Sequence, residues 1–292
     1  MHCSSYLILP RPLPNLIFYF FICFSSSSAG FLVVSFFVLS ISSIAEEMKL
    51  KADDLFRINQ LIEIDVKMLP DDWEKLRKES DRNNGSMSRI FGGGASIGKR
   101  FNLYKADISV DGKKIKSVGI RTKGFIGSLN PERPSLKIKF NEYVDQSPVQ
   151  GLDRLTLNYN VQDVALASQY LTYKLFYKAG IPAPRVSHCK VTVNGEYLGV
   201  YSHVESVRSP FIKKHFQRNS GELYEGTISD FYPIAVQNIE AKNSYTEKNR
   251  TQALKLAEIL ETKEGFNLNE AKNYINLKQF VRFWAMERLL GF

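Results

Sequence analysis

Two short turn signals, each set between runs of alternating apolar and polar residues, most constrain how this chain can fold. They are the dipeptides Asp111-Gly112 and Asn194-Gly195. Asp or Asn followed by Gly readily adopts the left-handed backbone of a two-residue hairpin turn, and we therefore predict two antiparallel hairpins within a larger sheet. The strands expected from alternation cover residues 61–66, 101–110, 114–122, 135–140, 154–159, 185–193, 196–205 and 221–226.

Helical periodicity is sparse within this strand-rich region and dominates near the C-terminus. One long helix is predicted over 164–179, with Asp163 as its N-cap and Gly180 just past its end. Shorter helices are predicted over 70–77, 210–216, 247–260, 269–274 and 276–292. Strands followed by helices predict an α+β fold. The expected organisation is an N-terminal segment over 1–45, a linker over 46–60, a strand-rich part over 61–230 and a helical part over 231–292.

The N-terminal segment 1–45 has the composition of a targeting sequence. Arg11 is its only Arg, Lys, Asp or Glu, and its second apolar run ends in the small-residue pattern Ser43-Ile44-Ala45. Such a run is typical of a secretory signal peptide with its cleavage site. A retained membrane anchor is the alternative, because about 20 apolar residues span a bilayer. Both interpretations predict a secreted or extracytoplasmic protein, which contacts a membrane only through this segment if it is uncleaved.

Charge and cysteine content limit the classes of function. The net charge of +9 favours anionic partners without identifying one. Cys189 is the only cysteine after residue 45, which excludes a disulfide within that region. His188, His203 and His215 do not have the spacing of metal ligands, so no metal site is predicted from them. The tyrosines fall mostly at apolar strand and helix positions, and we therefore expect no nucleic-acid partner.

Alternation in two predicted strands separates an apolar face from a basic one. Arg121 and Lys123 share one face of the first strand, and Lys137 and Lys139 share one face of the second. If the two strands pair, the four side chains form a cationic sheet face, and the apolar face is expected to pack on a helix. A cationic face fits phosphate groups, for which lysine is a compact point charge, but a solvated sheet face has the same pattern.

Asn160 lies in the polar junction 158–163 between a predicted strand and the long predicted helix. Junctions of this kind often place polar side chains at a ligand. Capping of the helix by Asp163 explains the same polar residues without a ligand.

Several sequence blocks, in the same order along the chain, resemble signatures of the CotH family, the spore-coat-protein-H-like atypical kinases. The resemblance covers roughly residues 61–292. The blocks lie at 118–124, 134–140, 155–163, 173–176, 179–185, 193–201, 204–205 and 221–226.

The resemblance implies a protein-kinase-like fold that uses ATP and a divalent metal, Mg²⁺, to phosphorylate Ser or Thr of partner proteins. The strand-rich part then corresponds to an N-lobe with a mixed or antiparallel sheet, and the terminal helices begin a C-lobe. The implied nucleotide-binding residues are Arg121, Lys123, Lys137, Lys139, Asn160 and Glu205. Lys123 or Lys137 is preferred as the phosphate lysine, and Glu205 is expected to mark the hinge that holds adenine through backbone groups.

One departure from the family affects the expected activity. The family continues from a helix like the terminal one into an aromatic–Asp–Gly–Tyr motif and further catalytic and metal-binding acids, which are expected beyond Phe292. No acid of this chain matches that motif, so we expect no phosphotransfer from these residues alone. The alternative from another class is a secreted surface or coat protein that uses the same fold for binding without catalysis.

Overall fold

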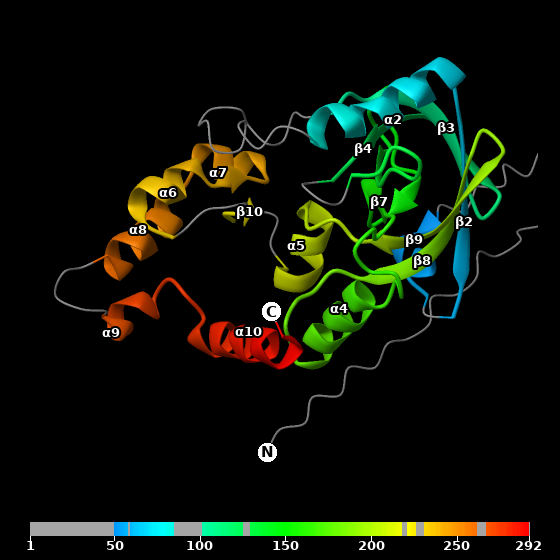
Figure 1. Ribbon diagram of the computed structural model, residues 1–292. Coiled ribbons are helices and arrows are strands. Elements are labelled where there is room, and N and C mark those ends of the chain that lie inside the picture. The colour runs from blue at the N-terminus through cyan, green and yellow to red at the C-terminus, as the bar shows by residue number, and fades with distance from the viewer. Residues whose placement is uncertain are drawn as a thin grey trace, which may run out of the picture. The chain divides into compact units, whose positions relative to one another are not determined.

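A closed β-barrel of seven strands organises the part of the chain that the computed structural model describes (Figure 1). The described residues are 50–57, 59–84, 101–124, 129–217, 221–225, 231–261 and 267–291. Around the barrel the strands follow the order β2, β3, β4, β5, β7, β9, β8. Their bounds are Leu61–Met68 (β2), Tyr104–Val110 (β3), Lys113–Thr122 (β4), Leu136–Lys139 (β5), Arg154–Asn158 (β7), Val186–Val193 (β8) and Glu196–Val204 (β9).

Strand β2 closes the barrel. It pairs antiparallel with β3 and parallel with β8, and all other neighbours in the barrel are antiparallel. Both hairpin turns bind β2, because the Glu63 N–H donates to Asp111 Oδ1 at 2.7 Å and the Met68 N–H donates to Asn194 Oδ1 at 3.0 Å. The fold is therefore α+β with a mixed sheet, as predicted, although the closure of that sheet was not predicted.

Both predicted hairpins are confirmed. β3 pairs antiparallel with β4, and β8 pairs antiparallel with β9. The turn residues Asp111 and Gly112 have φ values of 48° and 81°, and Asn194 and Gly195 have φ values of 51° and 90°. Positive φ at both central residues is the geometry that twists the flanking strands correctly, which explains the Asp-Gly and Asn-Gly sequences.

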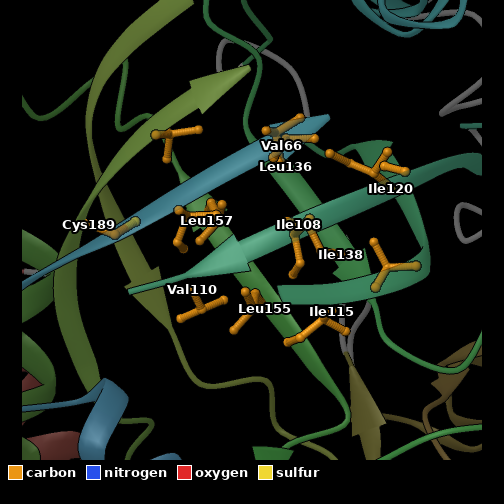
Figure 2. Packing of buried hydrophobic residues seen from close by; sticks show 14 of the residues in the cluster. Val66, Ile108, Val110, Ile115, Ile120, Leu136, Ile138, Leu155, Leu157 and Cys189 are labelled. Atoms are coloured by element: carbon orange, nitrogen blue, oxygen red, sulfur yellow. The ribbon is translucent and has the colours of Figure 1, made fainter. Parts of the chain in front are cut away.

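The barrel interior is filled by apolar side chains from alternate strand positions. β2 buries Ile62, Ile64 and Val66 and exposes the residues between them. Figure 2 shows Ile108 and Leu155 among the core side chains that different strands contribute. The apolar faces were expected to pack on a helix. They pack on one another as well, because the sheet curls until opposite strands meet.

Two helices complete this core. α1 (Ala52–Leu55) contributes Ala52 and Leu55, and α2 (Pro70–Asn84) contributes Trp73 and Leu76. Two further short strands, β1 (Leu50–Lys51) and β6 (Val149–Gln150), pair in parallel beside α1.

The helix after β7 begins later than predicted. α4 (Ser168–Lys178) has Ala167 as its N-cap, so the prediction of Asp163 at that position is wrong. The intervening residues turn instead, with Leu166 at a φ of 54°. Asp163 still binds the helix start, because its Oδ2 accepts from the Ser168 N–H at 2.7 Å. Gly180 follows the helix end with a φ of 73°, as predicted.

The remaining chain is mainly helical, with one short strand pair. The elements are α5 (Ser209–Phe216), β10 (Tyr224–Glu225), α6 (Pro233–Asn238), β11 (Glu240–Ala241), α7 (Ser244–Lys248), α8 (Thr251–Leu260), α9 (Leu268–Ala271) and α10 (Leu277–Leu290). The helix predicted over 247–260 is divided, because the backbone of Asn249 is extended. Of the strand predicted over 221–226, only β10 is strand among the described residues, and its partner β11 was not predicted.

The terminal helix α10 packs on α4. The rings of Phe283 and Phe176 lie 5.5 Å apart, and Met286 and Leu290 contact the same apolar cluster. Asn276 caps α10 by accepting from the Gln279 N–H at 3.1 Å.

The N-terminal segment 1–45 and residues 46–49 and 58 of the linker lie outside the described residues. In the part of the chain that is described, no helix combines the length and apolar character that crossing a bilayer requires. The division of the folded part near residue 230 stays a prediction.

One end of the barrel buries a histidine beside an ion pair. His203 stacks on Phe56 with ring centroids 4.4 Å apart, and the Arg185 guanidinium lies 4.6 Å from the centre of the same ring. Arg185 Nε donates to Glu205 Oε2 at 3.0 Å. Burial, together with the positive charge of Arg185, lowers the pKa of His203 to about 4, so this histidine is neutral in the folded protein.

This burial predicts acid sensitivity. Between pH 6.5 and about 4, the unfolded chain binds a proton at His203 that the folded chain does not. The free energy of unfolding therefore falls as pH drops through this window, by about 3 kcal/mol in total from this residue. Urea unfolding at pH 7.0, 5.5 and 4.5 should show a shallower pH dependence for His203→Gln than for the wild type. Parallel pH profiles would contradict the assignment.

The core also predicts a cavity effect. Leu155 is fully buried in the barrel, so Leu155→Ala should lower the free energy of unfolding by about 2–5 kcal/mol, as measured by urea unfolding. Val144 is 50% exposed, and Val144→Ala is the matched control, with an expected change below about 0.5 kcal/mol. Equal effects of the two substitutions would contradict the packing described here.

Candidate functional site

The register of three barrel strands gathers basic side chains on one outer face. Arg121 of β4 lies directly opposite Lys137 of β5, and Thr156 of β7 lies opposite Lys137 on its other side. Successive side chains of a strand point to opposite faces, and the intervening Ile120 and Ile138 are fully buried in the core. The two basic strands are thus neighbours, which is the condition under which the sequence predicted a shared cationic face.

Two further arginines extend this face. Arg154 is the first residue of β7, and Arg208 immediately precedes α5. After burial, the charges of Arg154 and Arg208 are the causes that lower the pKa of Arg121. The same two arginines also lower the pKa of Lys137. We call the set Arg121, Lys123, Lys137, Arg154 and Arg208 the cationic face.

The two half-buried lysines of the cationic face have the most perturbed pKa values. Burial, followed by the charges of Arg121, Arg154, Lys123 and Arg208, lowers the pKa of Lys137 to about 7. Burial and Arg121 lower the pKa of Lys123 to about 8, against an opposing effect of Glu225. The charges that lower the pKa of Lys137 are positive, so an anion bound at this face would relieve their repulsion.

A pocket of about 270 Å³, lined mostly by polar residues, lies at the end of the cationic face that carries Lys123. Lys123 Nζ donates to Asn158 Oδ1, and Asn158 Nδ2 donates to Gln169 Oε1 at 2.9 Å. We call it the amide pocket; its lining includes Lys123, Ser135, Asn158, Asn160, Asp163 and Gln169.

Asn160 also has a structural role. Its φ of 58° is in the left-handed region, which a short polar side chain tolerates better than a branched one. Its Nδ2 donates to Ser202 Oγ at 2.6 Å, which joins the turn after β7 to β9. The residue therefore shapes the amide pocket as well as lining it.

Two of the predicted site residues are engaged elsewhere. Lys139 forms an ion pair with Glu142 at 2.8 Å. Glu205 is buried, and its carboxylate accepts from the side chain and from the backbone N–H of Arg185. The Glu205 N–H donates to the Arg185 carbonyl at 2.9 Å. The hinge role of Glu205 stays a prediction. Its backbone N–H is already used in the hydrogen bond to Arg185.

Sequence reasoning missed two of the cations. Arg154 has the same strand parity as Thr156 and Asn158, so alternation along β7 could have placed it on the cationic face. Arg208 is brought there by the chain reversal between β9 and α5, which leaves no periodic signal in the sequence.

A second, more apolar pocket of about 460 Å³ lies beside α5. Its walls are largely aliphatic and aromatic, which suits a flat or apolar group. The lining residues are Pro182, Val207, Phe211, Ile212, Phe216, Gly221, Glu222, Leu223, Asn243 and Gln279.

Comparison with protein families gives one match. The family described as CotH kinase protein matches residues 120–291, which is more than half of the chain. The chain therefore belongs to the CotH kinase protein family, as the sequence blocks predicted. The match includes the cationic face and the amide pocket. Comparison with curated proteins gives no match.

The cationic face should cost stability. The pKa of Lys137 is about 7 in the folded chain, compared with 10.5 for an unperturbed lysine. The loss of folding stability that this causes is fully present below pH 7 and disappears as the pH rises toward 10.5. Lys137→Met should raise the free energy of unfolding at pH 7 by about 1–3 kcal/mol, and by less at pH 9.5. Urea unfolding at both pH values measures this difference.

The matched control is Lys116→Met, which removes an exposed lysine of the neighbouring strand β4. We expect little change for this variant. A loss of stability in Lys137→Met, or an equal gain in both variants, would show that Lys137 is not under electrostatic strain.

Proposed function

We propose that the cationic face and the amide pocket bind the phosphates of ATP in a protein-kinase-like phosphotransferase that modifies Ser or Thr of partner proteins. The observation that carries this proposal is the register pairing of Arg121 with Lys137, next to the half-buried Lys123. Partly buried cations crowded against one another are unfavourable unless an anion compensates them. Membership of the CotH kinase protein family supports the phosphate as that anion.

Each group would have a definite task toward the phosphates. Arg121 and Lys137 provide charge on adjacent strands of a rigid barrel, so their spacing is fixed before the ligand arrives. Asn158 positions the Lys123 ammonium by accepting from it, and side-chain amides of the pocket are further hydrogen-bond donors. In this arrangement the protein orients the phosphates and neutralises their charge, which is its main contribution to phosphoryl transfer.

When bound, Mg²⁺ would share in neutralising the charge of the phosphates. Among the described residues, no group of three His, Cys, Asp or Glu side chains is placed to hold a metal ion.

The proposal extends to the arrangement of the nucleotide and of the lobes. The barrel would serve as the N-lobe and the helices from α6 onward as the start of a C-lobe. Val207 lies in the apolar pocket and Arg208 in the cationic face, so a base in that pocket would be close to phosphates on that face. This placement agrees with a hinge near Glu205. The N-terminal apolar segment supports export, so the partner proteins would be extracytoplasmic.

The test is ATP binding by the purified chain, measured by calorimetry with Mg²⁺ present. Lys137→Met and Arg121→Met should each weaken binding by about 10- to 100-fold, because each removes a charge-assisted phosphate contact. Lys116→Met should bind as the wild type does. Wild-type affinity should fall between pH 7 and 9, because Lys137 and Lys123, with pKa values near 7 and 8, lose their protons.

Wild-type binding that neither substitution weakens would contradict this site. Absence of ATP binding by the wild type would favour the non-catalytic surface protein of the same fold.

A further inference from the structure

A pair of carboxylates from the helical part of the chain approaches the cationic face. Glu225 of β10 and Glu240 of β11 are direct cross-strand partners. Lys242 forms ion pairs with both, and its distance to Glu240 Oε1 is 2.9 Å. Arg208 NH1 donates to the Lys242 carbonyl at 3.2 Å, which ties this strand pair to the cationic face. Two like charges side by side are thus held together by one ammonium.

Glu225 interacts with the lysines of the cationic face. Its charge opposes the lowering of the pKa of Lys123. Burial acts to raise the pKa of Glu225, but Lys242, Lys137 and Arg208 together lower it. Both Glu225 and Glu240 oppose the lowering of the pKa of Arg208. Glu225 is therefore the carboxylate of this pair whose interactions extend from Arg208 to the lysines.

We propose that Glu225 is a specificity residue, which makes the cationic face select a polyphosphate that carries a divalent cation over the uncomplexed polyphosphate. The inference rests on the proposed function and adds a discriminating group to it.

The physical reason is repulsion. A carboxylate beside a phosphate site raises the free energy of a bound anion, and it does so more for the uncomplexed nucleotide, whose charge is larger than that of its magnesium complex. Phosphates that fill the cationic face would lie close to Glu225, because this residue already interacts with the lysines there. Glu225 is 56% exposed, so solvent screening limits the effect to about 3- to 10-fold in affinity.

Lys242 determines how strongly Glu225 repels phosphates. Its ammonium offsets part of the charge of Glu225 and is shared with Glu240. Removal of Glu240 leaves Lys242 entirely to Glu225, which then repels the phosphates less. This makes Glu240→Gln a matched control, with the same chemical change, the same lysine partner and a smaller expected effect.

The experiment measures the affinity of the full chain for ATP with excess Mg²⁺ and with EDTA at constant ionic strength. The readout is the ratio of the two dissociation constants for the wild type, Glu225→Gln and Glu240→Gln. The wild type should prefer the magnesium complex, and Glu225→Gln should reduce this preference by about 3- to 10-fold, mainly by binding uncomplexed ATP more tightly. Glu240→Gln should change the ratio by less than about twofold. An unchanged ratio in Glu225→Gln overturns the inference.

A second readout needs no nucleotide. The chain is treated with a limiting amount of an amine-reactive reagent at pH 7, and labelling of Lys123 and Lys137 is measured by peptide mass spectrometry. Loss of the negative charge at Glu225 should leave these lysines less protonated and more reactive, and Glu240→Gln should not. Unchanged reactivity in Glu225→Gln overturns the coupling on which the inference depends.

Failure of the inference about Glu225 can be distinguished from failure of the proposed function. Tight ATP binding with a preference that Glu225→Gln leaves unchanged removes the inference and keeps the proposed function. No ATP binding by the wild type or by either variant, with altered lysine reactivity in Glu225→Gln, removes the proposed function, and the inference falls with it.

Discussion

The pairing of β2 with β8 is the constraint on which the rest of the structure depends. It is the one parallel contact in the barrel, and it turns a curled antiparallel sheet into a closed wall. The turn residues Asp111 and Asn194 both accept hydrogen bonds from the β2 backbone, so the two hairpins fix the strand that joins them. Closure of the barrel fixes the register of its strands, so the side chains on the outer face of β4, β5 and β7 are held in fixed positions. The cations therefore keep their mutual spacing without a ligand.

The cationic face and the barrel core are opposite sides of the same strands. Ile120 and Ile138 are fully buried, while the adjacent Arg121 and Lys137 are held against one another with lowered pKa values. Crowding of like charges is unfavourable, and it persists because the packed interior does not let the strands move apart. Such local strain at a site that a rigid scaffold supports is typical of functional surfaces rather than of solvated sheet faces.

Local sequence patterns were sufficient to predict part of the fold and part of the candidate site. Alternation predicted the two hairpins and the shared face of Arg121 and Lys137, because strand parity and turn chemistry act over a few residues. Closure by β2, the contribution of Arg208 and the β10–β11 pair depend on contacts between distant parts of the chain, so no local pattern predicted them. The wrong prediction of Asp163 as the N-cap of α4 has a similar cause. A good capping residue was present, but the left-handed turn at Leu166 delayed the start of α4.

Closure by an early strand also has a consequence for how the chain acquires its structure. β2 is the first barrel strand in the sequence, and its partner β8 comes after four other barrel strands and α4. Contacts between positions so far apart lower folding rates, because a long loop must close before they form. Until β8 has been made, one edge of β2 has unpaired N–H and C=O groups, and a strand edge of this kind readily pairs with other chains. This edge of β2 therefore stays unpaired while four of the five cationic-face residues, Arg121, Lys123, Lys137 and Arg154, are synthesised.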